Sequence, residues 1–143
     1  MILGEYLKYI WRIKMELCLP KNEFRISITS CCNMKCVYCH NEGNKNKSML
    51  SIDNIRTILD HSNNIGMSHI RLTGGEPLIH PQIIEICKML AEKYHLKVGI
   101  NTNCIEIEKL LQMIKNDWID RVIVGLDYYD KSISKQSPIG RSS

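Results

Sequence analysis

Residues 24–42 read FRISITSCCNMKCVYCHNE, a short apolar strand pattern that runs directly into four of the chain's seven cysteines. Phe24, Ile26 and Ile28 alternate with polar residues, which predicts a strand over Phe24–Thr29 with one apolar face. Three residues separate Cys32 from Cys36, and two separate Cys36 from Cys39. Three thiolates on one loop can bind three irons of a [4Fe–4S] cluster, which leaves the fourth iron without a protein ligand.

Two alternatives to a cluster on Cys32, Cys36 and Cys39 involve the neighbouring residues Cys31 and His40. Cys31 lies directly before Cys32, but the spacing selects Cys32 as the ligand. A zinc site would use Cys32, Cys36, Cys39 and His40. Side chains of adjacent residues tend to diverge, so His40 is an awkward fourth ligand for a tetrahedral ion.

Length and composition indicate one small α/β domain. The chain has 143 residues and a net charge of +4, with its basic residues scattered, so no nucleic-acid partner is expected. An odd number of cysteines, four of them within nine residues, does not fit a secreted disulfide framework. No apolar run approaches the roughly 18 residues that span a bilayer. We therefore expect a cytoplasmic protein without a membrane partner.

Strand and helix patterns alternate after the cysteines. Ser51 is placed to cap one helix, Pro81 opens the next, and residues 105–115 predict a third. Strand patterns cover residues 69–73, Leu96–Asn101 and Arg121–Leu126. With Phe24–Thr29 they predict four parallel strands with flanking helices. The expected domains are an N-terminal helix over residues 1–20, a core over 21–130, and a polar tail over 131–143 without a strand.

Unusual residues follow the predicted strands, where parallel α/β folds place their functional groups. Thr73-Gly74-Gly75-Glu76-Pro77 combines glycines that permit close approach to a ligand with a carboxylate that can accept hydrogen bonds from an ammonium group. Asn103 either lines a ligand pocket or caps a helix. Asp127 either contacts a ligand or ends its strand in solvent.

These motifs resemble those of the radical S-adenosylmethionine (SAM) superfamily. Residues 24–42 resemble the signature in which a strand precedes C-x3-C-x-aromatic-C, and residues 73–77 resemble the family's GGE motif. The resemblance implies a partial (βα) barrel, a [4Fe–4S] cluster on the three cysteines, and SAM on the open iron. It also implies a SAM pocket formed by Tyr38, Gly74, Gly75, Glu76, Asn103 and Asp127. Cys104 and Gly125 stand where the family often has glycine and serine.

The resemblance further implies an enzyme that cleaves SAM reductively to a 5′-deoxyadenosyl radical, which abstracts hydrogen from a substrate. A one-electron reductant is then a required partner. Residues 36–42, CVYCHNE, resemble those of activating enzymes for glycyl-radical proteins, whereas RISITSCCNMKCVYC and LTGGEPL resemble the molybdenum-cofactor-synthesis and peptide-modifying branches more. A peptide substrate is therefore the leading hypothesis, with activation of a glycyl-radical protein as the alternative. A third hypothesis is a non-catalytic fragment, because the family core has six βα units and four are predicted here. A sheet that stops at an apolar fourth strand would leave an edge and an apolar face uncovered, which suggests a homo-oligomer.

Overall fold

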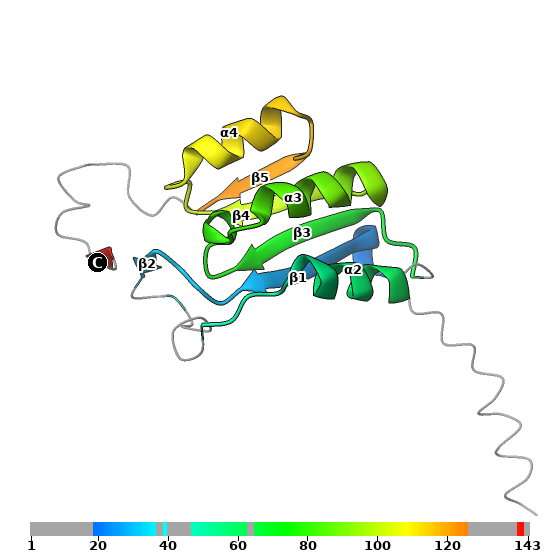
Figure 1. The fold of residues 1–143 in the computed structure, drawn as a ribbon, viewed down its shortest axis with the longest axis horizontal. Coiled ribbons are helices and arrows are strands. Elements are labelled where there is room, and N and C mark those ends of the chain that lie inside the picture. Colours follow the sequence, from blue (N-terminus) through cyan, green and yellow to red (C-terminus); the bar gives the residue numbers. More distant parts are fainter. Residues whose placement is uncertain (1–18, 37–38, 40–46, 63–64, 126–139, 142–143) are drawn as a thin grey trace, which may run out of the picture.

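Four parallel strands form the central sheet of the computed structural model, which describes residues 19–36, 39, 47–62, 65–125 and 140–141 (Figure 1). The sheet confirms the α/β fold with four parallel strands that the sequence predicts. In spatial order the strands are β1 (Glu23–Thr29), β3 (His69–Gly74), β4 (Lys97–Thr102) and β5 (Arg121–Val124).

A helical connection follows each of the first three strands. The helices are α2 (Ile52–His61), α3 (Ile83–Lys88) and α4 (Ile107–Lys115), with 3-10 turns η1 (Pro20–Asn22) and η2 (Pro77–Ile79). Ser51 caps α2 as predicted, because its side chain accepts a hydrogen bond from the Asn54 N–H at 3.2 Å. The helix expected after Pro81 instead begins at Ile83 and widens at Met89–Lys93 into a π-helical turn, η3.

The helices cover one face of the sheet, as Figure 1 shows. Side chains paired in a parallel sheet point to the same side and alternate along each strand. The buried residues of this face pack with helical residues into one apolar core. From the strands the core takes Ile26, Ile28, Ile70, Leu72, Val98 and Ile100, and from the helices Ile55, Leu59, Ile83, Ile86, Leu90, Leu110 and Met113.

The opposite side of the sheet, which we name the open face, is largely polar. Its residues by register are Glu23, Arg25, Ser27, His69, Arg71, Thr73, Lys97, Gly99, Asn101, Arg121 and Ile123. This side of the sheet is therefore not the uncovered apolar face that the sequence predicts. In a closed (βα) barrel the helices lie outside, so this face corresponds to the barrel interior.

Apolar surface is exposed on α4 and β5 instead. Ile107, Leu111 and Ile114 lie along one side of α4 and are 41–42% exposed, and Val124 of β5 is 44% exposed. Within the described residues, β5 pairs with β4 alone and so leaves a free sheet edge.

A second sheet corrects the prediction of a strandless tail. Met34–Lys35 (β2) pairs antiparallel with Gly140–Arg141 (β6). Two residues carry no periodic pattern, and the pairing joins segments about a hundred residues apart, so sequence periodicity does not reveal it. Most of the predicted N-terminal helix and of the tail lies outside the described residues. Among those that are described, no helix has the length and apolar character to cross a bilayer.

Candidate functional site

The cysteine loop leaves the C-terminal end of β1. Cys32 and Cys36 are partly buried, Cys39 is exposed, and all six cysteines within the described residues are free thiols. The Met34 N–H donates to Cys32 Sγ at 3.3 Å, and the Cys39 N–H donates to the Cys36 carbonyl at 3.1 Å. Tyr38 lies outside the described residues, so its predicted role is untested.

The three thiols belong to one electrostatic site with Glu76. Burial raises the pKa of Cys32, and the Met34 N–H lowers it. The negative charges of Glu76, Cys36 and Cys39 then raise this pKa further. The Cys32 thiol therefore lies within range of both of the other predicted ligands and of the carboxylate that ends the GGE motif.

Across the described segments, no three His, Cys, Asp or Glu side chains converge closely enough to hold a single metal ion. The alternative zinc site includes His40, which lies outside those segments, so that site is untested. The thiols of a [4Fe–4S] cluster each bind a different iron.

Gly74 and Gly75 lie against the backbone of the cysteine loop. A Cβ on Gly74 would overlap the Thr29 carbonyl, and a Cβ on Gly75 would overlap the Cys31 carbonyl. The Gly75 N–H donates to the Thr29 carbonyl at 2.8 Å, and the Glu76 N–H donates to the Cys31 carbonyl at 2.7 Å. The close approach that requires glycine here is thus between two backbone segments, and it fixes the GGE turn to the cysteine loop.

Glu76 is 1% exposed, and its carboxylate accepts three hydrogen bonds from the described residues. Its Oε1 accepts from the Leu78 N–H at 3.0 Å and from Thr102 Oγ1 at 2.7 Å. Its Oε2 accepts from the Asn103 N–H at 2.7 Å. Each carboxylate oxygen can accept about two hydrogen bonds, so Oε2 retains capacity for one further donor.

Asn103 joins a turn to the cysteine loop. Its Oδ1 accepts from the Ile105 N–H at 3.0 Å, and its Nδ2 donates to Asn33 Oδ1 at 2.8 Å. The N-cap of α4 is Glu106, so Asn103 closes the turn before the helix and does not cap the helix itself. Cys104 has φ +58°, a left-handed conformation that favours glycine. This backbone geometry accounts for the glycine that the family often has there.

Asn101 carries an unpaired buried atom that sequence reasoning did not assign. Its Oδ1 is buried and has no hydrogen-bond partner within the described residues. A buried acceptor without a partner is costly, and at a site it points to a missing ligand or water. Its place on the open face beside Ile123 depends on strand register, which the sequence alone does not give.

Three arginines form a row across the open face. Arg25 pairs with Arg71 in register, and Gly99 of β4 separates Arg71 from Arg121. Glu23 Oε2 lies 2.7 Å from Arg71 Nη2 and 3.8 Å from Arg121 Nη1. Arg25 is exposed and has no ion pair within the described residues. The row was not predicted because its members are far apart in the sequence.

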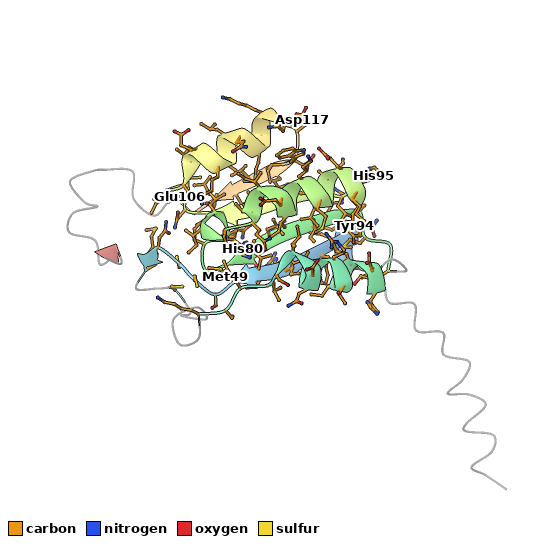
Figure 2. All side chains as sticks on the ribbon, viewed as in Figure 1. Met49, His80, Tyr94, His95, Glu106 and Asp117 are labelled. Atoms are coloured by element: carbon orange, nitrogen blue, oxygen red, sulfur yellow. The ribbon has the colours of Figure 1, made fainter. Side chains whose placement is uncertain are left out.

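His80 is buried and forms the C-cap of η2. Its Nε2 lies 3.0 Å from the Leu50 carbonyl, and its Nδ1 accepts from the Gln82 N–H at 3.1 Å. The histidine therefore tethers the segment before α2 to the turn before α3. Figure 2 shows His80, Met49 and Glu106 at the β2 end of the molecule, opposite Tyr94, His95 and Asp117.

The donor set fits an iron–sulfur cluster and a ligand with an ammonium group. Free thiols are the usual protein ligands of such clusters, and the N–H directed at Cys32 Sγ resembles the hydrogen bonds that tune them. Oε2 of the buried Glu76 retains capacity to accept another hydrogen bond, and the Glu76 N–H donates to the same loop. Asp127, the last predicted pocket residue, lies outside the described residues.

Comparisons with known proteins agree on one family. The Radical SAM superfamily model matches residues 26–142. A probable GTP 3′,8-cyclase of Methanococcus maripaludis strain C7 is 38% identical over 119 residues, which are 82% of this chain and 40% of that protein. The corresponding protein of Pyrococcus horikoshii is 34% identical over 113 residues, covering 78% and 36%. The chain therefore spans about 40% of the length of the curated relatives it matches.

Solved structures show the same fold. Streptococcus suis SuiB bound to S-adenosylmethionine superposes with a TM-score of 0.71 at 20% identity, over 96% of this chain and 32% of SuiB. SuiB bound to its precursor peptide SuiA gives 0.70 at the same identity, over 96% and 31%. The chain thus belongs to the radical SAM superfamily of enzymes, whose cofactors are a [4Fe–4S] cluster and S-adenosylmethionine.

Proposed function

We propose that this chain forms the cluster- and SAM-binding part of a radical SAM enzyme, with Cys32, Cys36 and Cys39 as the cluster ligands. The observation that carries the proposal is the hydrogen bond from the Glu76 N–H to the Cys31 carbonyl at 2.7 Å. It fixes a buried carboxylate beside the cysteine loop. A ligand that spans the two would touch both a cluster iron and a hydrogen-bond acceptor.

Each residue then has a defined task. The thiolates hold three irons, and Glu76 Oε2 accepts a hydrogen bond from the amino group of SAM, with Gly74 and Gly75 holding Glu76 in place. Asn103, Tyr38 and Asp127 complete the pocket as the family resemblance implies. When bound, the reduced cluster and SAM supply a 5′-deoxyadenosyl radical that abstracts hydrogen from the substrate. The protein orients the reactants and excludes water from them.

A one-electron reductant and a reducing compartment belong to the same proposal. Cysteines that bind a cluster must be available as thiolates, a state that a reducing cytoplasm maintains. We therefore place the protein in the cytoplasm.

For the substrate, the open face favours an anion such as a nucleoside triphosphate. Four cations lie on this face and only Glu23, among its described residues, carries a carboxylate. Arginine forks match phosphate oxygens in pairs. GTP is the specific candidate, because the curated relatives are named probable GTP 3′,8-cyclases. The arginine row lies four residues before the end of β1, about 13 Å at 3.3 Å per residue, so the substrate must extend that far to reach the cysteine loop.

Two other substrates remain candidates. The peptide substrate that the motif resemblance favours has a parallel in SuiB, which was crystallised with its precursor peptide, but the likeness to SuiB extends to the fold alone. Activation of a glycyl-radical protein is the other. A non-catalytic fragment that binds both cofactors without turnover is the remaining hypothesis.

We also propose self-association through the exposed side of α4. Ile107, Leu111 and Ile114 are exposed on α4, and β5 leaves a free sheet edge within the described residues. Exposed apolar surface and free sheet edges both favour association.

The test is anaerobic reconstitution of the chain with iron and sulfide, followed by SAM and dithionite. We expect the absorbance of a [4Fe–4S] cluster and formation of 5′-deoxyadenosine. Cys36→Ala should lose the cluster, whereas Cys87→Ala, which alters a buried core cysteine, should keep it. A chain that binds zinc tightly and takes up no cluster would overturn the proposal.

The substrates are separated by adding each one to the reconstituted chain. GTP, a peptide encoded by a neighbouring gene and a candidate glycyl-radical protein are compared for stimulation of 5′-deoxyadenosine formation. A cluster that forms but never cleaves SAM would favour the fragment hypothesis.

A further inference from the structure

Asn33 and Asn103 connect the cysteine loop to the turn after β4. Asn103 Nδ2 donates to Asn33 Oδ1 at 2.8 Å, across seventy positions of sequence. Asn33 follows Cys32 directly, and Asn103 follows Thr102, which donates to Glu76. The bond therefore links the neighbour of a predicted cluster ligand to the surroundings of the predicted SAM-binding carboxylate.

The Asn103 side chain is held in one orientation. Its Oδ1 faces the Ile105 N–H, so the other end of the amide must present Nδ2 to Asn33. The backbone of the same residue is fixed as well, since its N–H donates to Glu76 Oε2 at 2.7 Å. Asn103 is thus a rigid connector between Glu76 and the amide oxygen of Asn33.

Cys32 consequently lies between two ties to Glu76. On one side the Cys31 carbonyl accepts from the Glu76 N–H at 2.7 Å. On the other side Asn33 reaches Glu76 Oε2 through Asn103. Cys39, by contrast, is exposed. The loop is therefore anchored to Glu76 on both sides of Cys32, to its backbone N–H on one side and, through Asn103, to its carboxylate on the other.

We propose that Asn33 and Asn103 are positioning residues that hold Cys32, and with it the cluster, in register with Glu76 for SAM binding. This inference rests on the proposed function, because it requires the cluster on Cys32 and SAM on Glu76. Substitution of a residue that orients a metal ligand typically lowers metal affinity or activity by about 10- to 100-fold.

The experiment compares variants of the reconstituted chain under anaerobic conditions. Asn33→Ala removes the acceptor. Asn103→Ser keeps an oxygen for the Ile105 N–H but is too short to reach Asn33. Asn33→Asp retains the oxygen that accepts from Asn103. Asn116→Ala is the control, because its Nδ2 bonds the Gln112 carbonyl at the far end of α4.

Three quantities are measured: iron and sulfide content, thermal unfolding of the apoprotein, and the SAM concentration that half-converts the electron paramagnetic resonance spectrum of the reduced cluster. We expect Asn33→Ala and Asn103→Ser to weaken SAM binding about tenfold. The double variant should be no weaker than either single variant, because both remove the same bond. Asn33→Asp and Asn116→Ala should match the unaltered chain.

The outcomes are separable. SAM affinity in Asn33→Ala equal to that of the unaltered chain, or losses that multiply in the double variant, would overturn the inference while leaving the proposed function intact. Loss of the cluster in Asn33→Ala that Asn33→Asp restores would support it, and loss in both would contradict it. An unaltered chain that takes up no cluster would instead overturn the proposed function and the inference together.

Discussion

At Gly75 the turn after β3 packs directly on the cysteine loop, and this contact has no room for a side chain. A Cβ there would overlap the Cys31 carbonyl, so Gly75→Ala must push the two backbone segments apart. Overpacking of this kind costs about 1–3 kcal/mol, and here it also strains the hydrogen bond from the Glu76 N–H to Cys31. We expect a fall of that size in the free energy of unfolding, with weaker SAM binding, measured by chemical denaturation and by spectroscopic titration.

Gly125→Ala is the matched control. Among the atoms of the described residues, none lies within 4 Å of a Cβ built on Gly125, so this substitution should change the stability by less than about 0.5 kcal/mol. Equal stability of the two alanine variants would show that the turn and the loop are not packed as described.

The sequence predicted the cysteines and the carboxylate of this site but not the residues that hydrogen-bond to them. The spacing of the cysteines and the placement of Glu76 after a strand pattern were readable from the sequence, because both are local. The partners of Glu76 were not, since Thr102 and Asn103 come from the next βα unit. Cys104 was noted as a departure from glycine, but its left-handed backbone became visible only in the structure.

At the scale of elements, α4 is apolar on two sides. Leu110 is 3% exposed and belongs to the core, whereas its neighbour Leu111 is 42% exposed beside Ile107 and Ile114. If this outer side mediates self-association, Leu111→Glu should shift the chain toward monomer in sedimentation velocity. The free energy of unfolding of the variant should change by less than about 0.5 kcal/mol, because Leu111 is an exposed residue outside the core.

Gln112→Glu adds the same charge to the same helix outside the apolar side, at an exposed position, and should leave association unchanged. Leu110→Ala should cost about 2–5 kcal/mol, which verifies that α4 packs on the sheet as described. A chain that sediments as a monomer at all concentrations before any substitution would contradict the self-association proposal.

Elements with a strong period were predicted well. The four strands and the helix after Ser51 follow apolar patterns that tertiary packing then uses, as Ile55 and Leu59 show. The pairing of β2 with β6 and the π-helical turn at Met89–Lys93 were missed. Both depend on hydrogen bonds whose partners the local sequence does not specify, such as the bond from the Tyr94 N–H to the Met89 carbonyl at 3.3 Å.

For the whole molecule, the division of the sheet into two faces has the largest consequence for function. The sequence indicated which strand residues are apolar, and these lie on the covered face, apart from Ile123 of β5. It did not indicate that Arg25, Arg71 and Arg121 would meet on the other face, because that requires the strand order and the register of three pairings. The peptide hypothesis, which rests on motif resemblance, therefore could not take the positive charge of the open face into account.

This charge predicts how the molecule binds its substrate. If the open face holds a triphosphate, Arg25→Ala should weaken GTP binding by about 10- to 100-fold, since a hydrogen bond to a charged group contributes about 1.5–3 kcal/mol. Arg25 is the informative position because it is exposed and forms no ion pair within the described residues. Its removal therefore leaves no buried carboxylate without a partner.

Lys115→Ala is the control. It removes an exposed cation at the end of α4 and should leave GTP affinity unchanged. Isothermal titration calorimetry of the reconstituted chain gives both affinities, and GTP affinity should also fall as salt is added. Equal GTP affinity in the two variants would contradict a phosphate site on the open face and would return the peptide to first place among the candidate substrates.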